Sequence, residues 1–240
     1  MQILEKIVDS LPNSQVKDVF VGVFDVAVES NKLGIATTVK EESLPHEGIN
    51  NSIPLNEHEV GELALYAFSE NWLEASLGMA AINSALSKYE KQARHINAKK
   101  LIEKYGIGKK VGIIGHFPFV ENSQNKFSEL MVFEKEPQKG DFSEKMIPEK
   151  LPHAEVVAIT STSFTNHTLE FILNYVASTS YVILLGPTTP LTPVLFNYHI
   201  DALCGVYFDE PLKIKRQIRE ATPYRKIKGK RYITLLKEDF

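Results

Sequence analysis

The chain has 240 residues, a formal net charge of −3, 43% hydrophobic and 24% charged residues, which is the composition of an ordinary globular protein. This balance excludes a broad basic surface, so we expect neither nucleic acid nor membrane among its partners. The single cysteine, Cys204, excludes an intramolecular disulfide framework. Because the amphipathic, acid-bearing N-terminus MQILEKIVDSLP is unlike a signal peptide, we expect a cytoplasmic protein.

The first half of the chain predicts a helix, a β-hairpin and two more helices. The β-branched and aromatic stretch Val16–Glu29 reads as one strand, and Leu33–Val39 returns as the second. Asn56 is expected to cap a helix that begins near Glu57. Residues 72–87 form a further helix, dense in small residues that suit close packing.

The second half alternates strands and helices. Strands are expected at 110–115, 129–134, 155–160, 181–186 and 202–207. Helices are expected at 98–105, 118–125, 166–178, 192–198 and 210–219, while the tail GKRYITLLKEDF fits a strand or a helix. Short apolar runs between helices are typical of a parallel sheet covered on both faces. We therefore predict an α/β protein with a small α+β domain at 1–95 and a Rossmann-like domain at 96–240.

The stretch VGIIGHFPFV ends a buried strand in a tight turn. It contains Gly112-x-x-Gly115, but not the third glycine of the dinucleotide fingerprint, and Pro118 lacks an amide hydrogen. Glu134 lies nineteen positions after Gly115, near the spacing of a ribose-binding acid, and Glu136 is almost as well placed. The alternative is that the two glycines only allow the strand and a helix to pack closely, and that both acids are solvent-exposed without a binding role.

Two further strand ends are candidate binding loops. The segment TSTSFTNHT is rich in hydroxyls, and we expect Asn166 to cap a helix and leave Ser161 in a loop that suits a phosphate or carboxylate. Plain capping and turn chemistry is the alternative. The loop GPTTPLTP is stiffened by three prolines. It either presents Gly186 and its neighbours to a ligand at the strand end or is a stiff connection without a binding role.

Metal and nucleophile signatures are absent from the sequence. The histidines lack ligand spacing, and there is no G-x-S-x-G or Walker A motif. Carboxylates and an imidazole lie close in sequence only at Glu41, Glu42, His46 and Glu47, where a solvated loop is the simpler interpretation. Asn83, inside an apolar helix, must find hydrogen-bond partners.

Four stretches together resemble a known family. GIATT, ASLGMAAINSAL, GHFPFV and LLGPTTPLTP, in this order, are similar to the heavy-metal-chelation family, formerly a domain of unknown function. The resemblance implies an enolase-N-terminal-like domain, a Rossmann-like domain and a cleft between them. Matching motifs make these residues cleft candidates: Thr37, Thr38, Asn83, His116, Phe117, Pro118, Gly186, Pro187, Thr188 and Thr189. Of these, Thr37, Thr38 and Asn83 are expected to bind substrate, and Gly115 is expected to bind a cofactor at its strand end.

Two functions are compatible with these features. One is an enzyme that condenses or hydrolyses a small nucleotide-, pterin-, flavin- or siderophore-like molecule, with His116 as the proton-transferring residue. An S-adenosylmethionine-dependent methyltransferase-like enzyme is a variant of it. The other is a binding protein for a divalent metal or a metal chelate. Under either function we expect a small-molecule ligand, and the sequence is compatible with a homo-oligomer.

Overall fold

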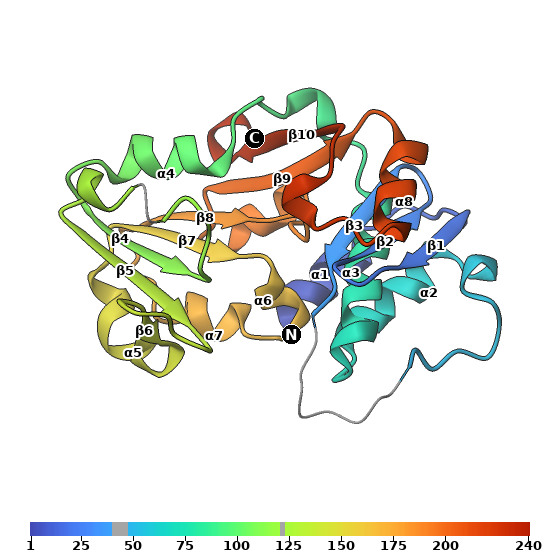
Figure 1. Cartoon of the computed structure of the whole chain (residues 1–240), viewed down its shortest axis with the longest axis horizontal. Helices are drawn as coiled ribbons and strands as arrows, with labels where there is room; N and C mark the ends of the chain where they lie inside the picture. Colours follow the sequence, from blue (N-terminus) through green and yellow to red (C-terminus); the bar gives the residue numbers. More distant parts are fainter. Residues whose placement is uncertain (40–47, 121–122) are drawn as a thin grey trace.

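The structure is a computed structural model that describes residues 1–39, 48–120 and 123–240. It contains a three-stranded antiparallel sheet and a seven-stranded, mostly parallel sheet, as the α/β prediction requires (Figure 1). Among the helices described, none combines the length and the apolar character needed to cross a membrane.

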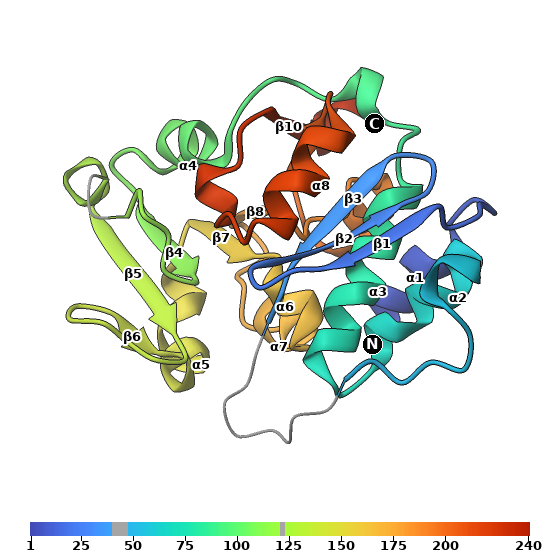
Figure 2. The same ribbon diagram turned by 45° about the vertical axis from the view of Figure 1, so that its right-hand side comes forward.

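The small sheet is a meander that lies between two helices. Its strands are β1 (Asp18–Val21), β2 (Asp25–Glu29) and β3 (Leu33–Thr37). Helix α3 (Trp72–Ala85) covers one face and α8 (Pro211–Arg219) the other, as Figure 2 shows. Helices α1 (Gln2–Asp9) and α2 (Val60–Ala64) pack beside α3. The C-terminal part of the chain thus returns to cover the N-terminal sheet.

The large sheet is formed by residues 110–236. Its strands are β4 (Lys110–Ile114), β5 (Glu129–Glu134), β6 (Phe142–Ser143), β7 (Val156–Thr160), β8 (Tyr181–Leu185), β9 (Ala202–Phe208) and β10 (Lys230–Leu236). Their spatial order is β10-β9-β8-β7-β4-β5-β6, parallel except for β10. When the strands are numbered along the chain from β4 as strand 1, the six strands from β6 across to β9 lie in the order 3-2-1-4-5-6. This is the strand order of doubly wound nucleotide-binding sheets.

Both faces of the large sheet are covered. Helix α4 (Ala98–Gly106) packs on one face, and α5 (Ile147–Lys150), α6 (Thr162–Thr165) and α7 (Leu169–Leu173) on the other (Figure 1). Successive residues of β7 alternate between the two cores, as a strand's two-residue period dictates. The core on the α5–α7 face continues into the small domain. The domain boundary near residue 95 stays a prediction.

Several expected elements differ from those observed. Val16–Glu29 is two strands, because Gly22 turns the chain: its N–H donates to the Asp25 carbonyl at 3.0 Å. Helix α2 begins at Val60 rather than near Glu57, since Glu59 and Glu62 form its capping box. The tail is β10, which pairs antiparallel with β9.

The described residues of the range 118–125 form no α-helix, and a short 3-10 helix, Gln124–Lys126, begins at the end of that range. Val120 N–H bonds to the Phe117 carbonyl, which closes a turn after β4. Within 166–178 the structure has only the short helix α7, and the hydroxyl-rich residues before that range form a further short helix, α6. The helix expected at 192–198 is a 3-10 helix capped by Thr192.

Candidate functional site

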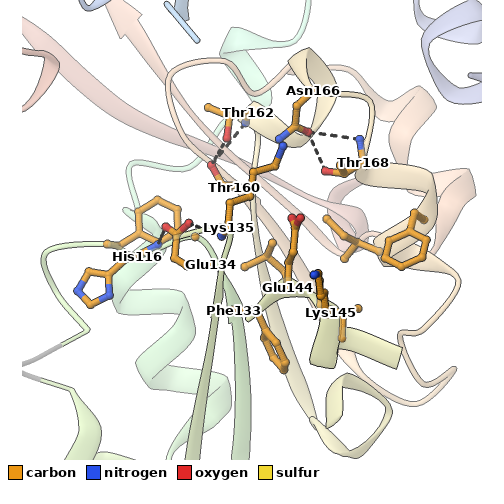
Figure 3. A pocket seen from close by; sticks show the side chains of 16 residues that line it. His116, Phe133, Glu134, Lys135, Glu144, Lys145, Thr160, Thr162, Asn166 and Thr168 are labelled. Carbon is orange, nitrogen blue, oxygen red and sulfur yellow. Dashed lines mark hydrogen bonds between the residues drawn. The ribbon is translucent and has the colours of Figure 1, made fainter. Parts of the chain in front are cut away.

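The carboxyl ends of β4, β5 and β7 surround a cavity of about 440 Å³, the switch-point cavity. In the sheet β4 lies between β5 and β7, so the cavity lies where the strand order reverses, the usual ligand position in such sheets. Its polar lining comprises His116, Glu134, Lys135, Glu144, Lys145, Thr160, Thr162, Asn166 and Thr168 (Figure 3). Phe117, Phe133 and Phe171 add apolar surface.

Gly115 shapes the cavity at the end of β4. Its φ is +100°, and a Cβ built there would lie 3.2 Å from Cβ of Thr160. Its N–H donates to the Phe133 carbonyl at 2.9 Å. Because a side chain would meet β7 in a conformation that L-residues rarely adopt, glycine is required where the β4 end approaches β7.

Glu134 ends β5 and lines the switch-point cavity. Its carboxylate accepts the His116 N–H and, at 3.2 Å, the Lys135 N–H. A carboxylate has about four acceptor sites, so it can accept further hydrogen bonds from a ligand. The neighbouring candidate Glu136 is exposed and does not line this cavity.

The His116 ring is paired with Asp141. Its Nδ1 lies 3.0 Å from Oδ2 of Asp141, and that carboxylate also accepts the Gln138 N–H at 3.1 Å. The Asp141 side chain is only 5% exposed. Figure 3 shows the imidazole directed away from Glu144 and Asn166, so His116 lies at the rim of the cavity. Asp141 was not predicted, since nothing in EPQKGD distinguishes it from a solvated turn acid.

The hydroxyl-rich segment after β7 is largely helical. Ser161 precedes α6, and Asn166 follows it as the C-terminal cap, so the expectation that Asn166 begins a helix is wrong. Its Oδ1 accepts from Oγ1 of Thr168 at 2.7 Å, and the side chain of Lys135 reaches toward it (Figure 3). Ser161 is buried rather than presented to a ligand, and Asn166 lines the switch-point cavity.

Asn83 and the threonines predicted to bind substrate lie elsewhere. The Asn83 amide donates to the carbonyls of Ile35 and Thr188, at 2.9 and 3.1 Å. Thr37 N–H donates to Oγ1 of Thr188 at 3.0 Å, and the Thr38 hydroxyl donates to the Gly22 carbonyl at 2.9 Å. The two bonds to Thr188 join the small domain to the loop after β8, and the bonds to Ile35 and Gly22 lie within the small domain.

A second hollow beside these bonds is too small for a substrate. The space bounded by Asn83, Pro187 and Thr189 measures about 10 Å³, at most room for one water. Gly186, at φ +131°, approaches Ser161 so closely that a Cβ would lie 2.6 Å from its Oγ. Substrate binding by Thr37, Thr38 and Asn83 stays a prediction, and the contacts observed for them are structural.

Metal ligands are not grouped in the part of the chain that the structure describes. Within residues 1–39, 48–120 and 123–240, no three His, Cys, Asp or Glu side chains are placed to hold one ion. The acidic segment with Glu41, Glu42, His46 and Glu47 lies outside the described residues.

Fold and cavity together define a two-sheet α/β protein with a ligand-sized hollow at the switch point. The chain belongs to the heavy-metal-chelation family. One family model, DUF364, described as "Putative heavy-metal chelation", matches residues 97–237, and a second, DUF4213, with the same description, matches residues 4–86. The predicted resemblance to this family is thus confirmed.

Known relatives agree with this assignment. An uncharacterized protein of Methanocaldococcus jannaschii, MJ0500, is 32% identical over 181 residues, 72% of this chain and 69% of the relative. A crystal structure of a DUF364-family protein of unknown function from Desulfitobacterium hafniense has a TM-score of 0.86 at 25% identity. One from Pyrococcus horikoshii, at 24% identity, has a TM-score of 0.83 and supports the fold. Both superpositions cover 98% of each chain.

Proposed function

We propose that the protein binds a small organic molecule with a flat ring and hydroxyl groups in the switch-point cavity. Nucleoside-, pterin-, flavin- and siderophore-like compounds are of this kind. The proposal rests on the 440 Å³ cavity at the point where the strand order reverses, with Glu134 at the end of β5 in its lining. Its volume falls within the range of about 300–1,000 Å³ that is usual for ligand pockets.

The lining suits a ligand with both polar and aromatic character. Glu134 is placed to accept hydrogen bonds from hydroxyls, as the acid at this strand end does in dinucleotide-binding sheets. Lys135 and the Asn166 amide supply donors for a carbonyl or an anionic group. Phe117 and the partly exposed Phe171 offer ring surfaces against which a flat ligand can stack.

His116 is the group best suited to move a proton at this site. When its Nδ1–H donates to Asp141, the other ring nitrogen, Nε2, carries a lone pair and acts as a base. Condensation and hydrolysis both need such a group near the ligand. Because the ring lies at the rim, the reacting atom of the ligand would extend toward the outer edge of the cavity.

The family description adds metal ions to this proposal. Without three clustered ligands among the described residues, a metal would arrive as a chelate whose organic part occupies the cavity. The competing hypotheses are direct binding of a divalent metal and binding of S-adenosylmethionine. Titrations with a metal chelate, a bare metal and S-adenosylmethionine distinguish these three hypotheses.

Isothermal titration calorimetry tests the proposal on the purified full chain. The probes are S-adenosylmethionine, adenosine, a pterin, a flavin, a metal–catecholate chelate and the bare metal. We expect at least one ring-bearing probe to bind, and Glu134→Gln to weaken it about tenfold, the equivalent of about 1.4 kcal/mol. The control is Glu136→Gln, an exposed acid two residues away. No binding by any ring-bearing probe, or equal weakening by both variants, would overturn the proposal.

A further inference from the structure

A second ligand-sized cavity lies on the other side of the turn after β4. It measures about 380 Å³ and is bounded by the end of β8, the middle of β9, the first residues of α4 and the segment that precedes β10. We call it the aromatic cavity, for Phe117, Phe119, Tyr224 and Tyr232 in its lining. Phe117 also lines the switch-point cavity, so its ring stands between the two hollows.

The walls of the aromatic cavity favour a flat apolar body. The rings of Phe117 and Phe119 stack nearly parallel, with centroids 5.5 Å apart and planes at 14°. Pro118 and Pro187 add rigid apolar surface, and Tyr232 is 45% exposed at the mouth. Aromatic walls of this kind bind rings by stacking and by burial of apolar area.

The charged groups in this lining are cations. Lys99 and Arg225 line the cavity, and among the described residues 1–39, 48–120 and 123–240 no Asp or Glu lines it. Burial raises the pKa of the Cys204 thiol to about 12, and raises the pKa values of Tyr224 and Tyr232, so these groups stay neutral at pH 7. Glu103, the acid of α4, forms an ion pair with Lys126 at 2.8 Å and a longer one with Lys99 at 3.8 Å. The described part of the lining therefore carries positive charge from Lys99 and Arg225.

The N-terminal end of α4 adds hydrogen-bond donors on the same side. The Asn97 side chain accepts the Lys100 N–H at 3.0 Å, which leaves the amides of Ala98 and Lys99 without an acceptor among the described residues. Both residues line the aromatic cavity. Free first-turn amides and the helix dipole favour an anion.

From these observations we propose that the aromatic cavity binds an aromatic carboxylate, with its ring against Phe117 and Phe119 and its carboxylate at Arg225, Lys99 and the start of α4. The site is separate from the proposed function, because it shares with the switch-point cavity the ring of Phe117 and none of its charged groups. The two cavities differ in chemistry: of the charged residues that the structure describes, both acids and cations line the first cavity, and cations line the second.

Calorimetric titration of the full chain with 1-naphthoate and its neutral analogue 1-naphthamide tests this site. We expect naphthoate to bind at least fivefold more tightly than the amide. Arg225→Gln should remove most of that preference and leave naphthamide binding unchanged, while the adjacent Lys226→Gln, outside the cavity, should change neither. Tyr232→Ser, at the exposed mouth, should weaken both ligands.

The same titrations distinguish this site from the switch-point cavity. Glu134→Gln should leave naphthoate binding unchanged even if it abolishes binding of the ligand proposed for the first cavity. Inorganic phosphate should compete poorly, since it lacks the ring. Equal affinity for naphthoate and naphthamide, equal effects of Arg225→Gln and Lys226→Gln, or no naphthoate binding up to millimolar concentration would overturn the proposal.

Discussion

Asn83 on α3 donates its side-chain amide to the main-chain carbonyl of Thr188, 3.1 Å away and 105 residues later in the chain. The same amide group donates to the Ile35 carbonyl on β3 at 2.9 Å. One 7%-exposed side chain thereby ties a helix and a strand of the small domain to the loop after β8. That loop is also where Gly186 and Pro187 bound the aromatic cavity.

Asn83→Ala is expected to lower the free energy of unfolding by about 2–3 kcal/mol. The substitution leaves two buried carbonyl groups without a donor, and each such group costs about 1–3 kcal/mol. Urea denaturation measures the change. The matched control is Asn31→Ala, which removes a long, 3.4 Å bond from the exposed Asn31 to the Ala85 carbonyl and should cost less than about 0.5 kcal/mol. Equal losses would show that Asn83 is not a structural clamp.

Gly115→Ala tests the close approach of β4 and β7. Gly115 and Gly140 share a φ of +100°. A Cβ built at Gly115 would lie 3.2 Å from Cβ of Thr160, whereas a Cβ built at Gly140 would have no heavy atom within 4 Å. Both variants incur the backbone strain of about 1–2 kcal/mol. Gly115→Ala should cost about 1 kcal/mol more, since overpacking adds to the strain. Thermal or urea unfolding of the two variants gives the difference, and equal costs would refute the packing argument.

Strands β4, β5, β7, β8 and β9 of the large sheet could be predicted from the sequence because each is a short, nearly continuous apolar run, whereas the tail that forms β10 fitted a strand or a helix equally. VVAI and YVILL need no tertiary information to read as buried strands. The small sheet was harder, because Gly22 breaks a β-branched stretch whose composition looks continuous. The order of the strands, and hence the switch point, is set by packing and could not be predicted from local patterns.

Spacing predicted little of the site beyond Glu134. It was predicted because it lies nineteen positions after Gly115, near the spacing of a ribose-binding acid, and His116 was predicted from the family resemblance. Asp141 pairs with His116 across a loop of ordinary turn composition, and Lys135 and Glu144 look like solvated charges in the sequence. Asn166 was assigned to the wrong end of a helix, because asparagine serves both N-terminal and C-terminal caps.

Lys215 on α8 holds two facing acids of the small sheet. Asp18 and Glu29 are directly opposite each other on β1 and β2, and the Lys215 ammonium contacts both, Asp18 at 3.0 Å. Burial acts to lower the pKa of Lys215, but the two carboxylates outweigh it and the pKa is raised. Without the cation the like charges repel across the strands.

Lys215→Met keeps the apolar stem and should lower the free energy of unfolding by about 1–2 kcal/mol, because the acids are partly exposed and screened. In a Glu29→Gln background the loss should be smaller, and a double-mutant cycle measures the coupling. Lys213→Met on the same helix breaks an exposed pair with Glu210 and should cost less than about 0.5 kcal/mol. A coupling of zero would contradict the assignment.

Asp25 makes stability depend on pH. It is 2% exposed, and neither carboxylate oxygen has a hydrogen-bond partner among the described residues. Burial raises its pKa to about 7, against the opposing charge of Lys230, and Tyr224 is a further titratable neighbour. In the unfolded chain the pKa of an aspartate is about 3.9. The folded state therefore holds a proton that the unfolded state loses between these values.

The stabilising effect of protonated Asp25 is complete below about pH 4 and is lost as the pH rises through about 7. The slope is about 1.4 kcal/mol per pH unit between these limits. Asp25→Asn removes this dependence, so its stability relative to the natural chain should rise by about 4 kcal/mol from pH 4 to pH 8. Urea denaturation across that range measures the difference. Asp9→Asn, at an exposed acid, should follow the natural chain at every pH, and the same behaviour in Asp25→Asn would show that Asp25 is ionised throughout.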